Sequence, residues 1–159
     1  MACVPAVGAG VSDGVHAAFA HRKYDLCGQG NLQPFVTFQV MRDALNSTGR
    51  PMVYSCEPQQ LRADPIEWPP HVANLFRTAA DIGPYYGLFT GDALLSNAWV
   101  NVATKGGWAD PGYLEVGNAP QMINVSESRT QFALWCFIKT ALCAFPVAHA
   151  GCLTQRVVG

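Results

Sequence analysis

Charged side chains that follow short apolar runs constrain the fold of this chain more than any other feature of its sequence. The first group is Lys23-Tyr24-Asp25, and three more come later in the chain, at Cys56-Glu57, Phe76-Arg77 and Asp81. Enzymes built on a parallel sheet carry their chemistry at the carboxyl ends of the strands. The pattern therefore predicts an α/β fold in which Asp25 and Asp81 form a pair of catalytic carboxylates.

The composition favours a single folded domain over residues 1–159, long enough to bury a core. Half of the residues are hydrophobic and 13% are charged. The net charge is −1 and the ten basic residues are scattered, so a nucleic-acid partner is not expected. No apolar run approaches the roughly 18–20 residues that span a bilayer, so we expect no membrane partner. No signal peptide is visible, and two glycosylation triplets, at 46–48 and 124–126, favour secretion only weakly.

The six cysteines lack the C-x-x-C spacing that is typical of metal ligands, so no metal site is expected. Cys136 and Cys143 are seven residues apart on a predicted helix, where we expect buried thiols. Cys3 and Cys27 could form a disulfide that closes a loop, although the sequence alone leaves the connectivity open.

Apolar residues at helical spacing predict a helix over residues 35–45, with Pro34 in its first turn and Gly49 at its end. A short strand over 51–55 follows and ends at Cys56-Glu57, which makes a helix-to-strand unit of the α/β type. We also expect the end of a helix over 15–20, a helix over 88–102, a strand over 113–116 and a helix with Ser126 as its N-cap.

A pair of carboxyl groups on either side of a glycosidic bond can cleave it, one as nucleophile or base and one as acid. Asp25 and Asp81 could act in this way only if the strands bring them together. Lys23 would lie on the same strand face as Asp25 and help to keep it ionised.

Each candidate also has an ordinary structural interpretation. An aspartate often caps a helix or a turn, and Arg77 and Asp81 would form a surface pair if both lay on one helix. Aromatic residues could stack on sugar rings or simply pack in the core or at its rim: Tyr54, Trp68, Trp108 and Tyr113.

Taken in order, the motifs resemble the centre of a melibiase-type α-galactosidase of glycoside hydrolase family 27. The resemblance covers about residues 23–139 in matching order and spacing. It rests on seven stretches: Lys23-Tyr24-Asp25-Leu26-Cys27, residues 41–51, Tyr54-Ser55-Cys56-Glu57, residues 76–82, Gly106-Gly107-Trp108-Ala109-Asp110-Pro111, residues 114–118 and Phe132-Ala133-Leu134-Trp135.

This resemblance implies a role for each candidate residue. Asp25 matches the nucleophile at the end of barrel strand 4, and Asp81 matches the general acid/base after strand 6. Lys23 and Arg77 match residues that hydrogen-bond sugar hydroxyls. Glu57 matches the residue that reads the 2-hydroxyl, and its charge and bulk favour galactose over N-acetylgalactosamine.

The resemblance also implies a retaining mechanism without a metal or cofactor. The expected partner is an α-galactoside oligosaccharide or glycoconjugate. A secreted or lysosomal/vacuolar location would follow from the same likeness. Cys27 matches a half-cystine of the family whose partner lies upstream, where Cys3 is the only candidate.

The departures from the family predict a partial (β/α)8 TIM barrel with about strands 4 to 7, since strands 1 to 3 are missing. The Asp-Asp pair that grips the 4- and 6-hydroxyls is absent, Gly112 replaces a family aspartate, and residues 140–159 match nothing. A full barrel needs about 250 residues. We therefore keep two functions open: a retaining α-galactosidase, and an inactive fragment of one that survives as a relic or a sugar-binding remnant. Little or no hydrolysis by the isolated chain is expected.

Overall fold

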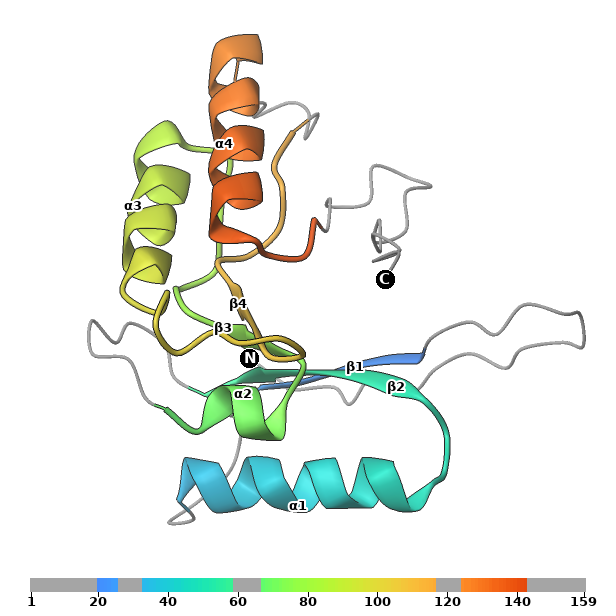
Figure 1. Cartoon of the computed structure of the whole chain (residues 1–159). Coiled ribbons are helices and arrows are strands. Elements are labelled where there is room, and N and C mark those ends of the chain that lie inside the picture. The colour runs from blue at the N-terminus through green and yellow to red at the C-terminus, as the bar shows by residue number, and fades with distance from the viewer. Residues whose placement is uncertain (1–19, 26–32, 59–66, 117–123, 143–159) are drawn as a thin grey trace, which may run out of the picture.

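The computed structural model of the protein describes residues 20–25, 33–58, 67–116 and 124–142. Within these ranges strands and helices alternate, and the four strands form one parallel sheet in the order β1-β2-β3-β4 (Figure 1). The elements are β1 (Ala20–Asp25), α1 (Pro34–Ser47), β2 (Met52–Glu57), α2 (Pro69–Val72), β3 (Leu75–Arg77), α3 (Tyr86–Asn97), β4 (Trp108–Asp110) and α4 (Val125–Ile138).

The helices gather at two places around the sheet. Helices α1 and α2 lie together below β1 and β2 in the view of Figure 1, and α3 and α4 stand side by side beyond β3 and β4. None of the helices in the described ranges is long and apolar enough to cross a membrane.

Side chains alternate between the two faces of the sheet, and one face carries the larger hydrophobic cluster. Tyr54, Cys56, Phe76 and Ala109 belong to this cluster together with residues of the surrounding helices and loops. The ring of Phe38 from α1 stacks on that of Trp68 at a centroid distance of 5.7 Å, and Phe76 meets Trp99 at 5.5 Å. Successive side chains of a strand point to opposite faces of the sheet. The charged residues that follow Cys56, Phe76 and Ala109 in the strands therefore point away from the hydrophobic cluster.

Helix α1 confirms the prediction made from its periodicity. Pro34 occupies the first turn, where its missing N–H removes no helical hydrogen bond. The chain leaves the helix through Gly49, whose φ of +66° suits a residue without a Cβ. Phe38 is the fully buried residue of this helix, so one apolar face docks α1 onto the sheet.

Several predicted boundaries were wrong. Ala20 begins a strand instead of ending a helix, while residues 15–19 lie outside the described ranges. Residues 113–116 form no continuous strand, since only Leu114 takes part in a β-bridge, and the strand lies instead at Trp108–Asp110, immediately after two glycines. Helix α3 ends at Asn97, five residues before the predicted end, and Ala98 caps it.

Asn124, and not Ser126, caps the last helix. The Asn124 side chain accepts the backbone N–H of Glu127 at 2.9 Å, and the Glu127 carboxylate accepts the backbone N–H of Asn124 at 3.1 Å. This reciprocal capping box satisfies two donors that the helix start leaves open. Cys136 on this helix is exposed, against the prediction of a buried thiol, and Cys143 lies outside the described residues.

Gly107 precedes β4 at a point where another chain segment passes very close. A Cβ at this position would lie 2.5 Å from Cα of Pro70 and 2.7 Å from its carbonyl oxygen. Gly91 in α3 is a contrasting case, because a Cβ there would meet no atom within 4 Å.

We predict that Gly107→Ala lowers the free energy of unfolding by about 1–3 kcal/mol, because backbone atoms must move to admit the methyl group. Gly91→Ala is the matched control and should raise stability by roughly 0.5–1 kcal/mol, since alanine favours the helix interior. Urea unfolding followed by circular dichroism measures both. Equal effects of the two substitutions would contradict the close approach at Gly107.

Candidate active site

A row of charged residues crosses the sheet at the carboxyl ends of its strands. Asp25 of β1 pairs in register with Glu57 of β2, and Arg77 of β3 pairs with Asp110 of β4. The preceding residues, Cys56 and Phe76, are also paired, so these two pairs lie at the same level. Four side chains from four strands therefore project from one edge of the sheet on the face opposite the main hydrophobic cluster.

Lys23 joins the two carboxylates at one end of this row. Its Nζ lies 2.7 Å from Oδ1 of Asp25 and 3.1 Å from Oε2 of Glu57. Burial would lower the pKa of the Lys23 ammonium, yet the contacts with Asp25 and Glu57 raise it above its usual value. Glu57 is only 4% exposed, whereas the side chain of Asp25 is half-exposed. The Lys23 ammonium therefore balances the charge of the buried Glu57 carboxylate and also contacts the more accessible carboxylate of Asp25.

Arg77 occupies the middle of the row and is almost completely buried. Its Nη1 donates to Oδ1 of Asp81 at 3.3 Å, and its Nη2 donates to the carbonyl oxygens of Ala79 and Ala80. Asp81 lies in the loop after β3 with 81% of its side chain exposed. The alternative of a surface pair on a helix is wrong, because Arg77 ends a strand and no helix spans the two residues.

Asp110 is a member of the row that the sequence analysis did not single out. Its Oδ1 accepts the backbone N–H of Gly112 at 2.9 Å. Burial raises the pKa of Asp110, and the charge of Arg77 and the hydrogen bond from Gly112 oppose the rise. The sequence contains the same pattern here as at the other strand ends, because Asp110 follows the short apolar run Trp108-Ala109.

The predicted site residues thus form two groups at one edge of the sheet. Lys23, Asp25 and Glu57 make the first group, and Arg77 and Asp81 make the second. The predicted disulfide between Cys3 and Cys27 falls outside the described residues. No group of three His, Cys, Asp or Glu side chains that could hold a metal occurs within the described part of the chain.

The aromatic candidates for sugar stacking have different environments. Tyr54 is buried, and its hydroxyl donates to the carbonyl oxygen of Phe38 at 3.4 Å, so stacking on a sugar is wrong for this residue. Trp68 packs on the rings of Phe35 and Phe38. Tyr113 remains 41% exposed beside the strand ends.

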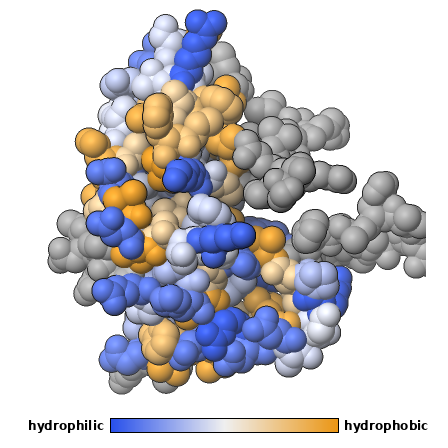
Figure 2. Space-filling model, in the orientation of Figure 1, coloured by the Kyte–Doolittle hydropathy of each residue, from blue (hydrophilic) through white to orange (hydrophobic). Residues whose placement is uncertain are grey.

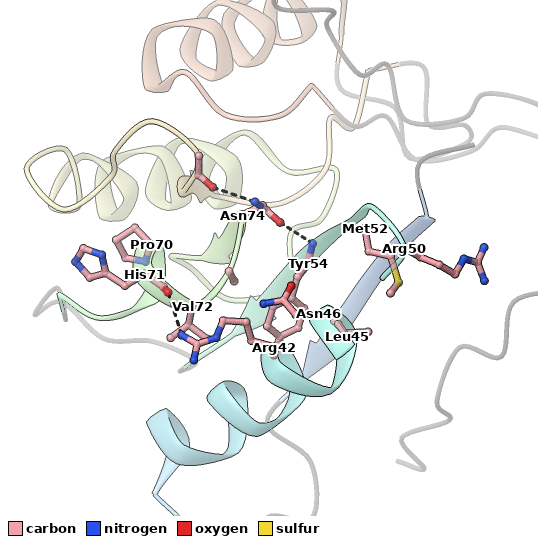
Figure 3. A pocket seen from close by; sticks show the side chains of 12 residues that line it. Arg42, Leu45, Asn46, Arg50, Met52, Tyr54, Pro70, His71, Val72 and Asn74 are labelled. Atoms are coloured by element: carbon pink, nitrogen blue, oxygen red, sulfur yellow. Dashed lines mark hydrogen bonds between the residues drawn. The ribbon is translucent and has the colours of Figure 1, made fainter. Parts of the chain in front are cut away.

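Two hollows in the described structure lie away from the charged row. One, of about 210 Å³, is found at the opposite edge of the sheet between the end of α1 and the starts of β2 and β3. Figure 3 shows its lining, in which Arg42 donates to the carbonyl of His71 and Asn74 bonds the backbone of Tyr54 and Gly106.

The other hollow, of about 860 Å³, is an apolar groove along α3 and α4. Apolar surface gathers over the part of the molecule where these two helices lie (Figure 2). Leu94, Val100 and Phe137 line the groove and are mostly exposed. Among the aromatic candidates, Tyr54 lines the first hollow and Trp108 the second, whereas no residue of the charged row lines either of these two.

A parallel sheet with alternating helices and a charged row at its carboxyl edge is typical of the wall of an α/β barrel. The sequence model of the family described as alpha galactosidase A (Melibiase_2) matches residues 16–145. The chain therefore belongs to the α-galactosidases of glycoside hydrolase family 27, and its fold is a partial TIM barrel of that family.

The relatives are longer than this chain. Alpha-galactosidase 3 of Arabidopsis thaliana is 40% identical over 121 residues, which cover 76% of this chain and 27% of the relative. An α-galactosidase of Oryza sativa is 31% identical over 76% of this chain and 28% of its own length. The solved α-galactosidase of Saccharomyces cerevisiae superposes with a TM-score of 0.67 at 26% identity, over 79% of this chain and 33% of that one.

We predict that Lys23→Met lowers the free energy of unfolding by about 1–3 kcal/mol, because it leaves the buried Glu57 carboxylate without its cation. Arg42→Met is the control, since the Arg42–Asp43 ion pair lies at the surface and should contribute less than about 1 kcal/mol. Chemical unfolding at pH 7 gives both values. A Lys23→Met loss no larger than the control would show that Glu57 does not depend on this cation.

Proposed function

We propose that this chain carries the nucleophile and the acid/base of a retaining α-galactosidase. The observation that supports it best is Lys23 between Asp25 and Glu57, because one cation then contacts both an accessible carboxylate and a buried one. Arg77 and Asp81 follow at the same edge of the sheet. The family membership of the chain agrees with this assignment.

The proposed reaction has two displacements. In the first, a carboxylate oxygen of Asp25 bonds to C1 of galactose while the bond from C1 to the leaving oxygen breaks, and protonated Asp81 gives its proton to that oxygen. In the second, Asp81 takes a proton from water, the water oxygen bonds to C1, and the ester to Asp25 breaks. Two inversions at C1 give net retention.

The proposed substrate is a terminal α-linked galactose on an oligosaccharide or glycoconjugate. The yeast α-galactosidase to which this chain is similar has also been solved with raffinose. Glu57 is proposed to read the 2-hydroxyl, and Lys23 and Arg77 to hold other hydroxyls. A secreted or lysosomal/vacuolar location is proposed on the same family grounds.

An inactive remnant of such an enzyme is the second candidate. The chain spans about a quarter to a third of the length of the relatives it matches. The candidate is favoured by Gly112, which stands where the family usually has an aspartate. Positioning is a large part of catalysis, and the loss of that carboxylate would weaken it.

A covalent trapping experiment separates the two candidates, because it detects the first displacement without requiring the ester to be hydrolysed. A fluorinated galactosyl donor with a good leaving group should add one galactosyl unit to the chain, and peptide mass spectrometry should find it on Asp25. Hydrolysis of a chromogenic α-galactoside should be slow beside that of a full-length relative. Asp25→Asn should abolish both signals.

Asp43→Asn is the matched control, since this exposed aspartate on α1 pairs only with Arg42 among the described residues. It should leave labelling unchanged. Labelling at a carboxylate other than Asp25 would overturn the assignment of the nucleophile. No labelling of a chain that unfolds cooperatively would favour the inactive remnant.

We further predict that Glu57→Ser shifts trapping from galactosyl toward N-acetylgalactosaminyl donors, because the smaller side chain leaves room for the acetamide. Glu67→Ser, at an exposed position, serves as the control for a lost carboxylate. The ratio of labelling by the two donors is the measurement. An unchanged ratio would mean that Glu57 does not contact the 2-position.

A further inference from the structure

Arg77 donates hydrogen bonds to three successive residues of the loop that carries Asp81. Its Nη2 donates to the carbonyl oxygens of Ala79 and Ala80, and its Nη1 donates to Oδ1 of Asp81 at 3.3 Å. The side chain of Arg77 is only 4% exposed, so the guanidinium meets the loop from inside the protein. A guanidinium is a rigid planar fork, and its bonds to backbone carbonyls therefore fix the course of the loop.

Both ends of this loop are anchored independently of the guanidinium. At the start, the backbone N–H of Thr78 donates to the carbonyl oxygen of Asp110 at 3.0 Å. The hydroxyl of Thr78 is also hydrogen-bonded to that of Ser96 on α3. At the end, Ile82 packs against a hydrophobic cluster that contains residues of α3 and α4. The guanidinium thus holds the part between the two anchors, residues 79–81.

The segment around Gly112 supports the guanidinium from another side. A Cβ on Gly112 would lie 3.2 Å from Ile82 and 3.6 Å from Nη2 of Arg77. The backbone of Gly112 is itself held in place, because its N–H donates to Oδ1 of Asp110 at 2.9 Å and its carbonyl oxygen accepts Nε1–H of Trp135 at 2.8 Å. The guanidinium therefore lies between the loop that it binds and a fixed stretch of backbone.

Asp81 is the exposed residue of this loop. Its neighbours over residues 78–82 are buried or half-buried, whereas 81% of the Asp81 side chain is exposed. The carbonyl contacts of Arg77 fix the backbone immediately before Asp81 and leave the carboxylate open to solvent. A group that gives a proton to a leaving oxygen must lie within hydrogen-bond reach of it. A displacement of about 1 Å can cost on the order of a hundredfold in rate.

We propose that Arg77 is the positioning residue of the acid/base, because it fixes residues 79–81 and so sets where the Asp81 carboxylate lies. This role is separate from the proposed contact of Arg77 with a sugar hydroxyl. It requires the fork of a guanidinium, whereas lysine offers a point charge on a flexible stem and cannot reproduce the three contacts. The catalytic consequence rests on the proposed function, whereas the fixing of the loop does not.

The first test measures the motion of the loop by ¹⁵N relaxation. The amide order parameters of residues 79–81 should be about 0.85 in the wild-type chain and below about 0.6 in Arg77→Lys. Arg42→Lys is the matched control, since Arg42 also donates to a carboxylate and to a carbonyl oxygen, but at the surface. It should leave the loop rigid. A loop that is mobile in the wild-type chain, or equally rigid in Arg77→Lys, would overturn the proposal.

The wild-type chain decides the question alone if Arg77→Lys does not fold. The Nη–H resonances of Arg77 should then be resolved by slow rotation of the guanidinium, with nuclear Overhauser contacts to residues 79–81. The Nη–H resonances of Arg42 serve as the comparison within the same spectrum and should be averaged by rotation. A guanidinium of Arg77 that rotates as freely as that of Arg42 would refute the hold on the loop.

The second test compares two fluorinated galactosyl donors that differ in the acidity of their leaving groups. A dinitrophenolate leaves without a proton, whereas a weakly acidic phenol needs one from Asp81. Arg77→Lys should therefore slow labelling of Asp25 by the second donor about tenfold more than labelling by the first. Equal slowing for both donors would contradict the positioning of the acid/base. Absence of labelling in the wild-type chain would count against the proposed function, and the relaxation measurement would still decide the hold on the loop.

Discussion

The parallel pairing of β1 with β2 is the constraint on which the rest of the structure depends. The two strands pair residue for residue from Ala20 and Met52 to Asp25 and Glu57. A slip of β1 by one residue would turn Lys23 and Asp25 toward the hydrophobic cluster and away from Glu57, so that their charges could not be hydrated. The register thus sets the core and the charged row at the same time.

Local signals in the sequence predicted the elements that depend on local physics. Helix α1 was predictable because its periodicity, its proline and its terminal Gly49 all agree. Strand β1 was harder to predict, since Ala-His-Arg-Lys-Tyr-Asp lacks the apolar run of a buried parallel strand. Its conformation is stabilised by pairing with β2 and by the ion pairs of Lys23, which a local pattern does not show.

The charged row could be predicted in part for the same reason. Glu57 and Arg77 were found because each ends an apolar run, and a parallel sheet aligns such ends. Asp25 was found through the order and spacing of the charged groups that follow it. Asp110 also follows a short apolar run. However, β4 has only three residues and comes after two glycines, so the sequence did not predict a strand there. The burial of Asp92 in α3 could not be predicted either, because an aspartate in an amphipathic helix is usually a surface residue and its burial depends on how α3 packs against α4.

A sheet whose strands pair in parallel and in chain order folds from long-range contacts. Ala20 meets Met52 only after α1 has been crossed, and Leu75 meets Trp108 only after α3. The described sheet therefore has no hairpin from which to nucleate, and loop-closure entropy must be lost before the backbone hydrogen bonds form. Helices such as α1 and the capped α4 need only local contacts, so strand assembly around them is expected to limit the rate of folding.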